Sequence, residues 1–443
     1  MAVVVLALLV GVHRYLWRRF VGDTTAEGSA LRTAGTVAAY LLPLLSVGAL
    51  VSGRTGAPFW LQQVLAWPGY LWLAALLYLT LALLVGEAVR PVLRRVLAAR
   101  AARAEITDAA SADGAGGADR TRGADEPDSP SAAEPLARKA SGTGTSAAGT
   151  LLAEAEAEVS DPSSRSVAAP TRRLFVARAV GGAAAVAGLG TVGQGTYGVL
   201  RGPRVKRITV PLAKLPRSAH GFRIAVVSDI HLGPVLGRAH TQRIVDTINR
   251  TQPDLVAVVG DLVDGTVADL GPAAEPLAQL SARRGSFFVT GNHEYYSGAA
   301  QWVDHVRELG LHPLENARVE IGGFDLAGVN DIGGESEGQG PDFERALGDR
   351  DRTRAAVLLA HQPVVIRDAV AHGVDLQLSG HTHGGQLWPG NYIAELANPT
   401  VAGLDRYGDT QLYVSRGAGA WGPPVRVGAP SDITVVELAS HQA

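Results

Sequence analysis

Five short apolar segments in the second half of the chain each run directly into Asp, Asn or His side chains. The segments and the residues that follow them are 224–227 with Asp229 and His231, 255–259 with Gly260 and Asp261, 287–289 with Gly291, Asn292 and His293, 357–359 with His361, and 376–378 with Gly380, His381 and His383. Short apolar runs bounded by glycine are typical of buried strands, and helical patterns at 241–250 and 302–309 lie between them. This alternation predicts an α/β fold, a layered β-sandwich flanked by helices.

All of the polar blocks follow the carboxyl ends of predicted strands, where loops of α/β folds collect ligands. Asp, Asn and His donors without thiolate suit Mn, Zn or Fe. The chain has no cysteine, which excludes disulfides and thiolate zinc sites. Gly260, Gly291 and Gly380 each precede a candidate ligand, and we expect the backbone to turn sharply at each of them.

In the order Asp-x-His, Gly-Asp, Gly-Asn-His-Glu, His and Gly-His-x-His, these blocks resemble the calcineurin-like metallophosphoesterase family over roughly residues 205 to 440. The resemblance implies a phosphoesterase with two divalent ions. It implies one ion on Asp229, His231 and His383, a second on Asn292, His361 and His381, and Asp261 bridging the two. It also implies that a hydroxide bridging the ions attacks phosphorus. His293 resembles the family's histidine on the substrate side, and we expect it to protonate the leaving group or to stabilise transition-state charge.

Four further features near the candidate site each allow two interpretations. Gly384 and Gly385 leave room for substrate or only form a tight turn. Asp264 orients a ligand or is a solvated loop aspartate. Glu294 supports the ligands or caps a helix, and we do not expect it to bind metal. Arg416 meets a phosphate or forms a surface ion pair.

Three apolar stretches occupy the first ninety residues, and they predict a membrane region over 1–103 with two to three transmembrane helices. Residues 2–12 are short of the ~20 that span hydrocarbon, so this stretch spans or lies at the interface as an amphipathic anchor. Residues 36–52 are uncharged. Residues 64–86 are the strongest candidate, with Trp67, Tyr70 and Trp72 suited to an interfacial belt.

The arginines predict which loops stay in the cytoplasm, because positively charged loops are retained there. Arg14, Arg18, Arg19 and Arg32 precede the second stretch, and Arg90, Arg94, Arg95, Arg100 and Arg103 follow the third. The loop at 53–63 between them holds only Arg54. Both basic flanks should therefore be inside and the 53–63 loop outside.

Two segments separate this region from the predicted phosphoesterase domain at 205–443. Residues 104–171 are rich in Ala, Gly, Ser, Asp, Glu and Pro, and we expect a disordered linker because so few large apolar residues cannot offset the ordering entropy. Residues 172–200 begin with Arg172-Arg173 and continue as an apolar Ala/Gly-rich run. They resemble a twin-arginine export signal, or they form a further transmembrane or signal-anchor helix. Either crossing predicts an extracytoplasmic catalytic domain, although Arg201, Arg204, Lys206 and Arg207 would then lie on the outer side.

The leading hypothesis is a membrane-anchored, metal-dependent phosphoesterase that cleaves a phosphodiester, phosphomonoester or pyrophosphate bond. Its motifs look most like the bacterial membrane-associated branch of the family, which implies a lipid-linked or cell-envelope substrate. Pro430-Ser431-Asp432 departs from the Pro-Glu pair that is more frequent in that branch. The alternative is a non-catalytic membrane sensor or scaffold. The formal charge of −2 gives no general attraction to nucleic acid, and the absence of acids and bases inside 36–52 and 64–86 argues against a transporter.

Overall fold

The computed structural model describes residues 2–116 and 172–441 of the chain. The described residues divide into two units. One unit contains the chain up to Glu87 together with everything from Ala177 onward, and the other contains the described residues between Ala88 and Val176. The first unit therefore holds both the N-terminal helices and the α/β domain.

Within residues 2–116 and 172–200, four α-helices precede the α/β domain. They are α1 (Ala2–Trp17), which continues as a π-helical turn at Arg18–Gly22, α2 (Ala30–Ser52), α3 (Phe59–Gly116) and α4 (Arg172–Leu200). By length and composition, α2, the Phe59–Thr107 part of α3 and α4 are long and apolar enough to cross a membrane. With 16 residues, α1 is shorter than the ~20 residues that span hydrocarbon.

The end of α3 differs from the sequence-based expectation. We expected no stable structure from residue 104 onward, but the helix runs on to Gly116. Ala101, Ala102 and Ala104 favour helix, and extending an existing helix avoids the cost of nucleating a new one. The rest of the predicted linker, 117–171, lies outside the described residues.

Small residues allow the long helices to approach closely. The Ser46 hydroxyl of α2 donates to the carbonyl of Gly69 in α3 at 2.8 Å. A Cβ on Gly188 of α4 would lie 3.0 Å from the Leu79 backbone nitrogen, and one on Gly86 would lie 2.7 Å from Val180. The later residue of α4, Gly188, lies against the earlier residue of α3, Leu79, and Val180 lies against Gly86. These two helices therefore run antiparallel. Close packing at glycine and serine is the usual way that helices associate in membranes.

The α/β domain contains two six-stranded mixed sheets. The first has the order β1-β12-β2-β3-β4-β5 and the second β10-β11-β9-β8-β7-β6. The strands of the first sheet, in that order, are Arg204–Leu212, Asp432–Ser440, Phe222–Val227, Leu255–Val259, Ser286–Val289 and His312–Pro313. Those of the second are Gly403–Tyr407, Thr410–Val414, Leu376–Ser379, Ala355–Leu359, Phe324–Gly328 and Ala317–Ile321.

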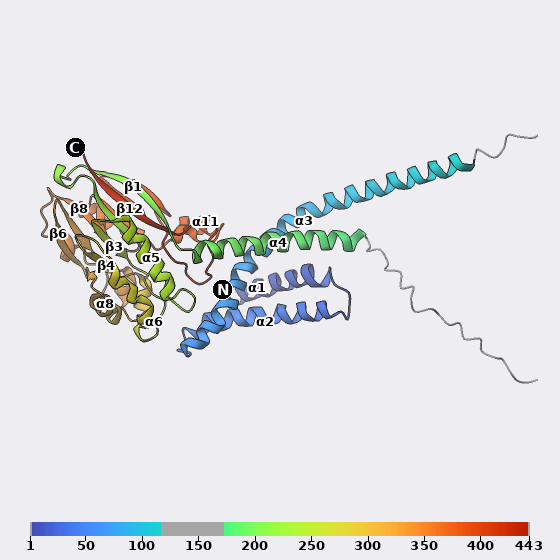
Figure 1. The fold of residues 1–443 in the computed structure, drawn as a ribbon, viewed down its shortest axis with the longest axis horizontal. Coiled ribbons are helices and arrows are strands. Elements are labelled where there is room, and N and C mark those ends of the chain that lie inside the picture. Colours follow the sequence, from blue (N-terminus) through green and yellow to red (C-terminus); the bar gives the residue numbers. More distant parts are fainter. Residues whose placement is uncertain (1, 117–171, 442–443) are drawn as a thin grey trace, which may run out of the picture. The chain divides into compact units, whose positions relative to one another are not determined.

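Helices cover the outer faces of the two sheets. On the first sheet they are α5 (Arg238–Thr251), α6 (Val267–Ala274) and α8 (Ala299–Glu308), seen together in Figure 1, and on the second α9 (Phe343–Leu347) and α10 (Ile366–Ala371). Two short helices, α7 (Asn292–Ser297) and α11 (Gly390–Ala397), follow site loops. The predicted layered sandwich is confirmed, and the five predicted strands and both predicted helices are present.

Period-2 alternation explains the layers. In β3, Leu255, Ala257 and Val259 enter the core between the sheets, whereas Val256 and Val258 face the helices. The strands are apolar on both faces because both faces are covered. Between the sheets, the buried Tyr413 hydroxyl of β11 lies 2.6 Å from the Thr434 hydroxyl of β12. This hydrogen bond joins the two sheets inside an otherwise apolar core.

We predict that Tyr413→Phe destabilises the domain by about 1 kcal/mol, because the buried Thr434 hydroxyl loses its partner. Phe324→Ala should lower the free energy of unfolding by roughly 3–5 kcal/mol, because it opens a cavity between the sheets.

Chemical denaturation of the purified chain in detergent, followed by tryptophan fluorescence, measures the free energy of unfolding of both variants. The exposed Tyr296→Phe is the matched control. Equal stability of Tyr413→Phe and Tyr296→Phe would contradict the inter-sheet role.

Candidate metal centre

Loops from both sheets meet at one edge of the sandwich. Strands β2, β3 and β4 are parallel neighbours in the first sheet, and β8 and β9 are parallel neighbours in the second, so the loops at their carboxyl ends share an edge in each sheet. The two edges are joined directly, because Nδ1 of His361, after β8, lies 2.8 Å from the carbonyl of Val259 in β3. Polar side chains that are far apart in the sequence therefore converge.

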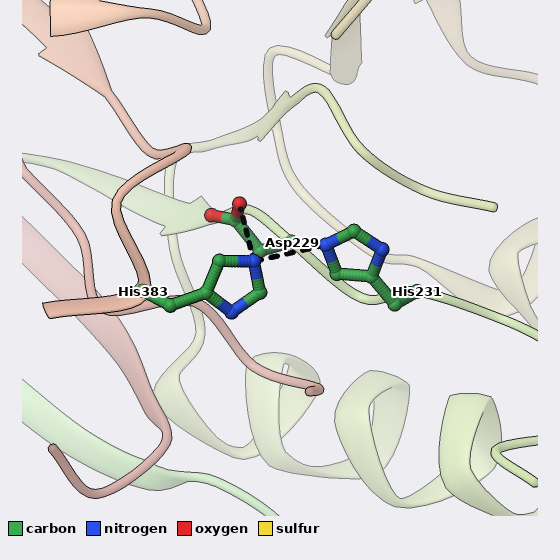
Figure 2. Close-up of side chains that lie close together, drawn as sticks. All are labelled: Asp229, His231 and His383. Carbon is green, nitrogen blue, oxygen red and sulfur yellow. Dashed lines mark hydrogen bonds and ion pairs between the residues drawn. The ribbon is translucent and has the colours of Figure 1, made fainter. Parts of the chain in front are cut away.

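A first group comprises Asp229, His231 and His383, which are all buried and point toward one another (Figure 2). Nε2 of His383 lies 3.0 Å from Nε2 of His231 and 3.3 Å from a carboxylate oxygen of Asp229. The possible ligand atoms of the group are within 4.8 Å of one another. This is one of the two ligand groups expected from the sequence.

A second group comprises Asp261, His361 and His381. Oδ2 of Asp261 lies 3.1 Å from Nε2 of His361 and 3.7 Å from Nε2 of His231 in the first group. The same carboxylate oxygen thus lies between the two groups, as expected of a bridging ligand. Asn292, the remaining expected ligand, begins α7 directly after the β4 loop, and its Oδ1 is buried.

Neighbouring groups orient the imidazoles. Nδ1 of His231 lies 2.9 Å from Oδ1 of Asp264, and Nδ1 of His361 faces the Val259 carbonyl, so both rings direct Nε2 into the site. The buried Arg426 donates to Nδ1 of His383 at 3.0 Å and to its carbonyl at 3.0 Å. The three histidines therefore present the same ring nitrogen, Nε2, to the other candidate ligands.

The donor set fits metal ions. Oδ1 of Asn292 is buried without a hydrogen-bond partner among the described residues, and Nε2 of His361 is buried with the Asp261 carboxylate 3.1 Å away. Burial lowers the pKa of His231, but the charges of Asp264, Asp261 and Asp229 and a hydrogen bond to Asp264 together outweigh it and raise the pKa to about 9. Burial likewise opposes protonation of His361, but Asp261, Asp229 and Asp331 together raise the pKa of His361 well above its usual range. Protonated imidazoles here balance buried carboxylates, which is the charge that bound cations would supply.

The left-handed backbone conformation falls on the candidate ligands themselves. Asp229, His231, Asp261, His381 and His383 all have φ between 49° and 73°. Such conformations cost energy in residues other than glycine and persist where the surrounding fold imposes them.

The expectation that the preceding glycines provide the turns is only partly correct. Gly260 has φ +73°, but neither Gly291 nor Gly380 has a positive φ. At Gly291 a Cβ would collide with the Asp261 carboxylate, and at Gly380 it would collide with Ser228 and Asp229. These two glycines are required because the loops approach one another closely.

Two residues with open roles now have defined contacts. Oδ1 of Asp264 lies 2.9 Å from Nδ1 of His231 and 2.6 Å from Nδ1 of His293. Burial raises the pKa of Asp264, but the charge of His231 and hydrogen bonds from both rings outweigh it and lower the pKa to about 2. Glu294 accepts backbone N–H groups from Gly291 at 2.6 Å, Asp261 at 3.0 Å and Leu262 at 2.7 Å. It therefore caps α7 and ties together two loops of the site.

The remaining features near the candidate site are the Gly384–Gly385 turn, Arg416 and His293. Gly384 and Gly385 have φ +62° and +79°, so they form a tight turn, and a Cβ on Gly384 would lie 3.0 Å from Cγ of Arg416. His293 is half-buried, with its ring centre 5.8 Å from that of Trp421. The sequence assigns no role in the site to Arg426, because no local motif marks an arginine that contacts a histidine 43 residues earlier.

Known proteins share this domain. Residues 222–385 match the family model for calcineurin-like phosphoesterase. An uncharacterized metallophosphoesterase from Aquifex aeolicus is 37% identical over 240 residues, which cover 53% of this chain and 91% of that protein. The chain belongs to the calcineurin-like phosphoesterase family. The uncharacterized metallophosphoesterase YkuE of Bacillus subtilis is 30% identical over 292 residues, which cover 61% of this chain and 98% of YkuE.

The name of one animal relative also refers to a transmembrane protein. A Danio rerio protein named "Transmembrane protein with metallophosphoesterase domain" is 40% identical over 250 residues, which cover 53% of this chain and 57% of the relative. The match thus spans little more than half of that relative's length.

We predict different losses for Asp261→Ala and His293→Ala. Asp261→Ala should lose bound metal, because it removes the carboxylate shared by both groups. His293→Ala should keep its metal and lose turnover by roughly two decades or more, as expected on loss of an acid–base group. Metal analysis and aryl phosphodiester hydrolysis measure the two effects, with the exposed His441→Ala as control. Unchanged turnover in His293→Ala would remove this side chain from the mechanism.

We predict that Asp264→Asn weakens metal binding by roughly 10–100-fold, because it removes the carboxylate that orients His231. Competition with a metal-sensitive chelating dye measures the affinity of the full chain. Asp304→Asn, a change of the same kind at an exposed ion pair with Arg307, is the control. Affinity equal to that of the control would show Asp264 to be only a solvated loop residue.

Proposed function

We propose that this protein is a membrane-anchored phosphoesterase that uses two divalent ions, Mn, Zn or Fe, to hydrolyse a phosphodiester, phosphomonoester or pyrophosphate bond. One ion would be held by Asp229, His231 and His383. The other would be held by Asn292, His361 and His381. Asp261 would contact both.

The position of Asp261 carries this proposal. Its Oδ2 lies 3.7 Å from Nε2 of His231 and 3.1 Å from Nε2 of His361, and these two nitrogens belong to different ligand groups. A single buried carboxylate oxygen between two sets of imidazoles is the arrangement that a dinuclear centre requires. A single metal site or a structural ion pair would not need the second set.

In this proposal the chain's own residues would bind the metal ions, orient the His293 ring and protonate the leaving group. Bound divalent ions would supply Lewis acidity toward phosphoryl oxygens and an activated water near neutral pH. Asp264 accepts from Nδ1 of His293 and leaves Nε2 as the nitrogen that can deliver a proton to a leaving group. Trp421 and Tyr296 pack edge-on against the His293 ring and limit its movement. Arg416, beside the Gly384 turn, would meet a phosphoryl oxygen.

We propose that α2, α3 and α4 cross the membrane, with 1–103 as the membrane region, 172–200 as a retained helix and 205–443 as the catalytic domain. Residues 104–171 would form a linker whose first part, up to Gly116, continues α3. The close packing of Gly188 in α4 on Leu79 in α3 supports a retained helix rather than a removed signal. With both basic flanks in the cytoplasm, an odd number of crossings puts the catalytic domain outside. The basic residues at 201–207 oppose this orientation.

We assign the substrate only to the phosphoric ester class, and we place the protein in the bacterial membrane-associated branch on its motifs alone. A non-catalytic sensor or scaffold is the competing function. Such a protein would not need the proton-holding pair of His293 and Asp264 beside a complete donor set. The pair therefore favours catalysis.

Hydrolysis by the purified full chain tests the proposal. We expect metal-dependent cleavage of an aryl phosphodiester or phosphomonoester, loss of activity with a chelator, and recovery when Mn, Zn or Fe is added back. Mg and Ca serve as comparison ions, and Asp261→Ala is the inactive control. A chain that binds two metal ions per molecule and cleaves no ester would establish the sensor or scaffold instead.

A further inference from the structure

Helix α11 presents an unusual apolar face beside the candidate metal centre. None of its residues is buried, and Tyr392, Ile393 and Leu396 are 59%, 72% and 88% exposed. At about 100° per residue these three side chains share one arc of the helix, whereas Asn391 and Glu395 lie on the other side. Such a face would normally be buried in a water-soluble domain.

Two exposed tryptophans lie in or next to the loop that leads into α11. Trp388 precedes α11, and Trp421 is hydrogen bonded through its backbone N–H and carbonyl to the Gln386 side chain, at 3.0 and 2.9 Å. We call Trp388, Tyr392, Ile393, Leu396 and Trp421 the apolar rim. It combines aromatic residues suited to a bilayer interface with aliphatic residues suited to the hydrocarbon beneath it.

The rim is attached to the helices that we propose cross the membrane. The Tyr78 hydroxyl of α3 donates to the Trp388 carbonyl at 2.9 Å. Leu387 and Val427 pack in the same apolar cluster as Leu79 and other α3 residues. Tyr78 lies within the uncharged stretch 71–85. The rim therefore starts at the depth of the apolar part of α3 and not beyond its end.

A second connection joins the same region to α4. The backbone N–H of Arg426 donates to the Gly195 carbonyl at 3.4 Å, and a Cβ on Gly195 would lie 2.6 Å from Val425. Val425 is fully buried in the cluster that contains Val192 of α4. Two of the proposed membrane helices thus hold the loops that carry the rim.

The same loops hold parts of the site. His383 lies three residues before Gln386, and Arg426 donates to its ring and carbonyl. Trp421 contacts the edge of the His293 ring. A surface that contacted Trp421 would therefore also lie close to His293, beside the candidate metal centre.

We propose that the apolar rim inserts into the bilayer surface and that the substrate is a phosphoester or pyrophosphate in a lipid head group. The substrate part rests on the phosphoesterase function proposed above. A bilayer is the occupant that the contacts favour, because the rim is continuous with helices whose other faces would be surrounded by lipid. A head-group phosphate lies in the interfacial layer that such an inserted helix occupies.

Site-specific labels test the membrane contact without requiring activity. Because the chain has no cysteine, Ile393→Cys or Leu396→Cys introduces a unique thiol in the full chain. We expect nitroxides at both positions, in phosphatidylcholine bilayers, to collide more with oxygen than with a water-soluble nickel complex. Val370→Cys, on the exposed side of α10, is the control and should show the reverse. Aqueous behaviour at 393 and 396 would overturn the insertion, and dipolar broadening between labels would replace the bilayer with a second copy.

Substrate selectivity tests the second part. The double change Ile393→Glu with Leu396→Glu should lower the ratio of lipid to soluble ester hydrolysis by roughly tenfold, since charged side chains enter hydrocarbon poorly. The lipid probes are phosphatidylglycerol and a polyprenyl pyrophosphate in phosphatidylcholine vesicles, and the soluble probe is an aryl phosphodiester. Val370→Glu should leave the ratio unchanged. An unchanged ratio in the double variant, or cleavage of the soluble ester alone by the unmodified chain, overturns the lipid substrate. Failure to cleave any ester overturns the phosphoesterase function itself, whereas the label depths still decide the membrane contact.

Discussion

Buried negative charge at the meeting of the two sheets is the constraint on which the site depends. Asp229 and Asp261 are almost completely removed from water, and burial raises the pKa of Asp229, with Asp261 raising it further. Such carboxylates require positive charge or hydrogen-bond donors beside them. Here the hydrogen-bond donors are Ser228 and backbone N–H groups. The positive charge comes from protonated imidazoles, and bound metal ions would take the place of those protons.

The buried strands of the sandwich hold both ends of the loops in which the candidate ligands adopt left-handed backbone conformations. Five candidate ligands hold left-handed backbone conformations, which only a fold that fixes both ends of each loop can maintain. The strands before these loops are buried on both faces, and the Tyr413–Thr434 bond ties the sheets together below the site. Glu294 adds a direct link, because it binds backbone groups of two different loops.

The helical residues up to Glu87 and from Ala177 to Leu200 are part of the same unit as the site. Tyr78 and Gly195 reach the loops that carry His383, Arg426 and Trp421, so the long apolar helices do more than tether the domain. This coupling gives a structural reason for an apolar rim beside a polar metal centre. A free soluble enzyme would have to hide that surface.

Much of the domain was predictable because its determinants are local. Apolar runs of strand length, interrupted by glycine and followed by Asp, Asn or His, indicated the sandwich and the edge where ligands collect. The role of Arg426 was not, since it reaches a histidine 43 residues away. The sequence left open whether Asp264 orients a ligand, because its contacts with His231 and His293 are made through space. Nor could a local pattern reveal that the left-handed conformations fall on the ligands, or that Gly291 and Gly380 serve close approach. The sequence by itself determined which chemical groups stand at the strand ends. Only the tertiary structure decided how they are oriented and which surface surrounds them, because those properties depend on contacts between segments that no local pattern encodes.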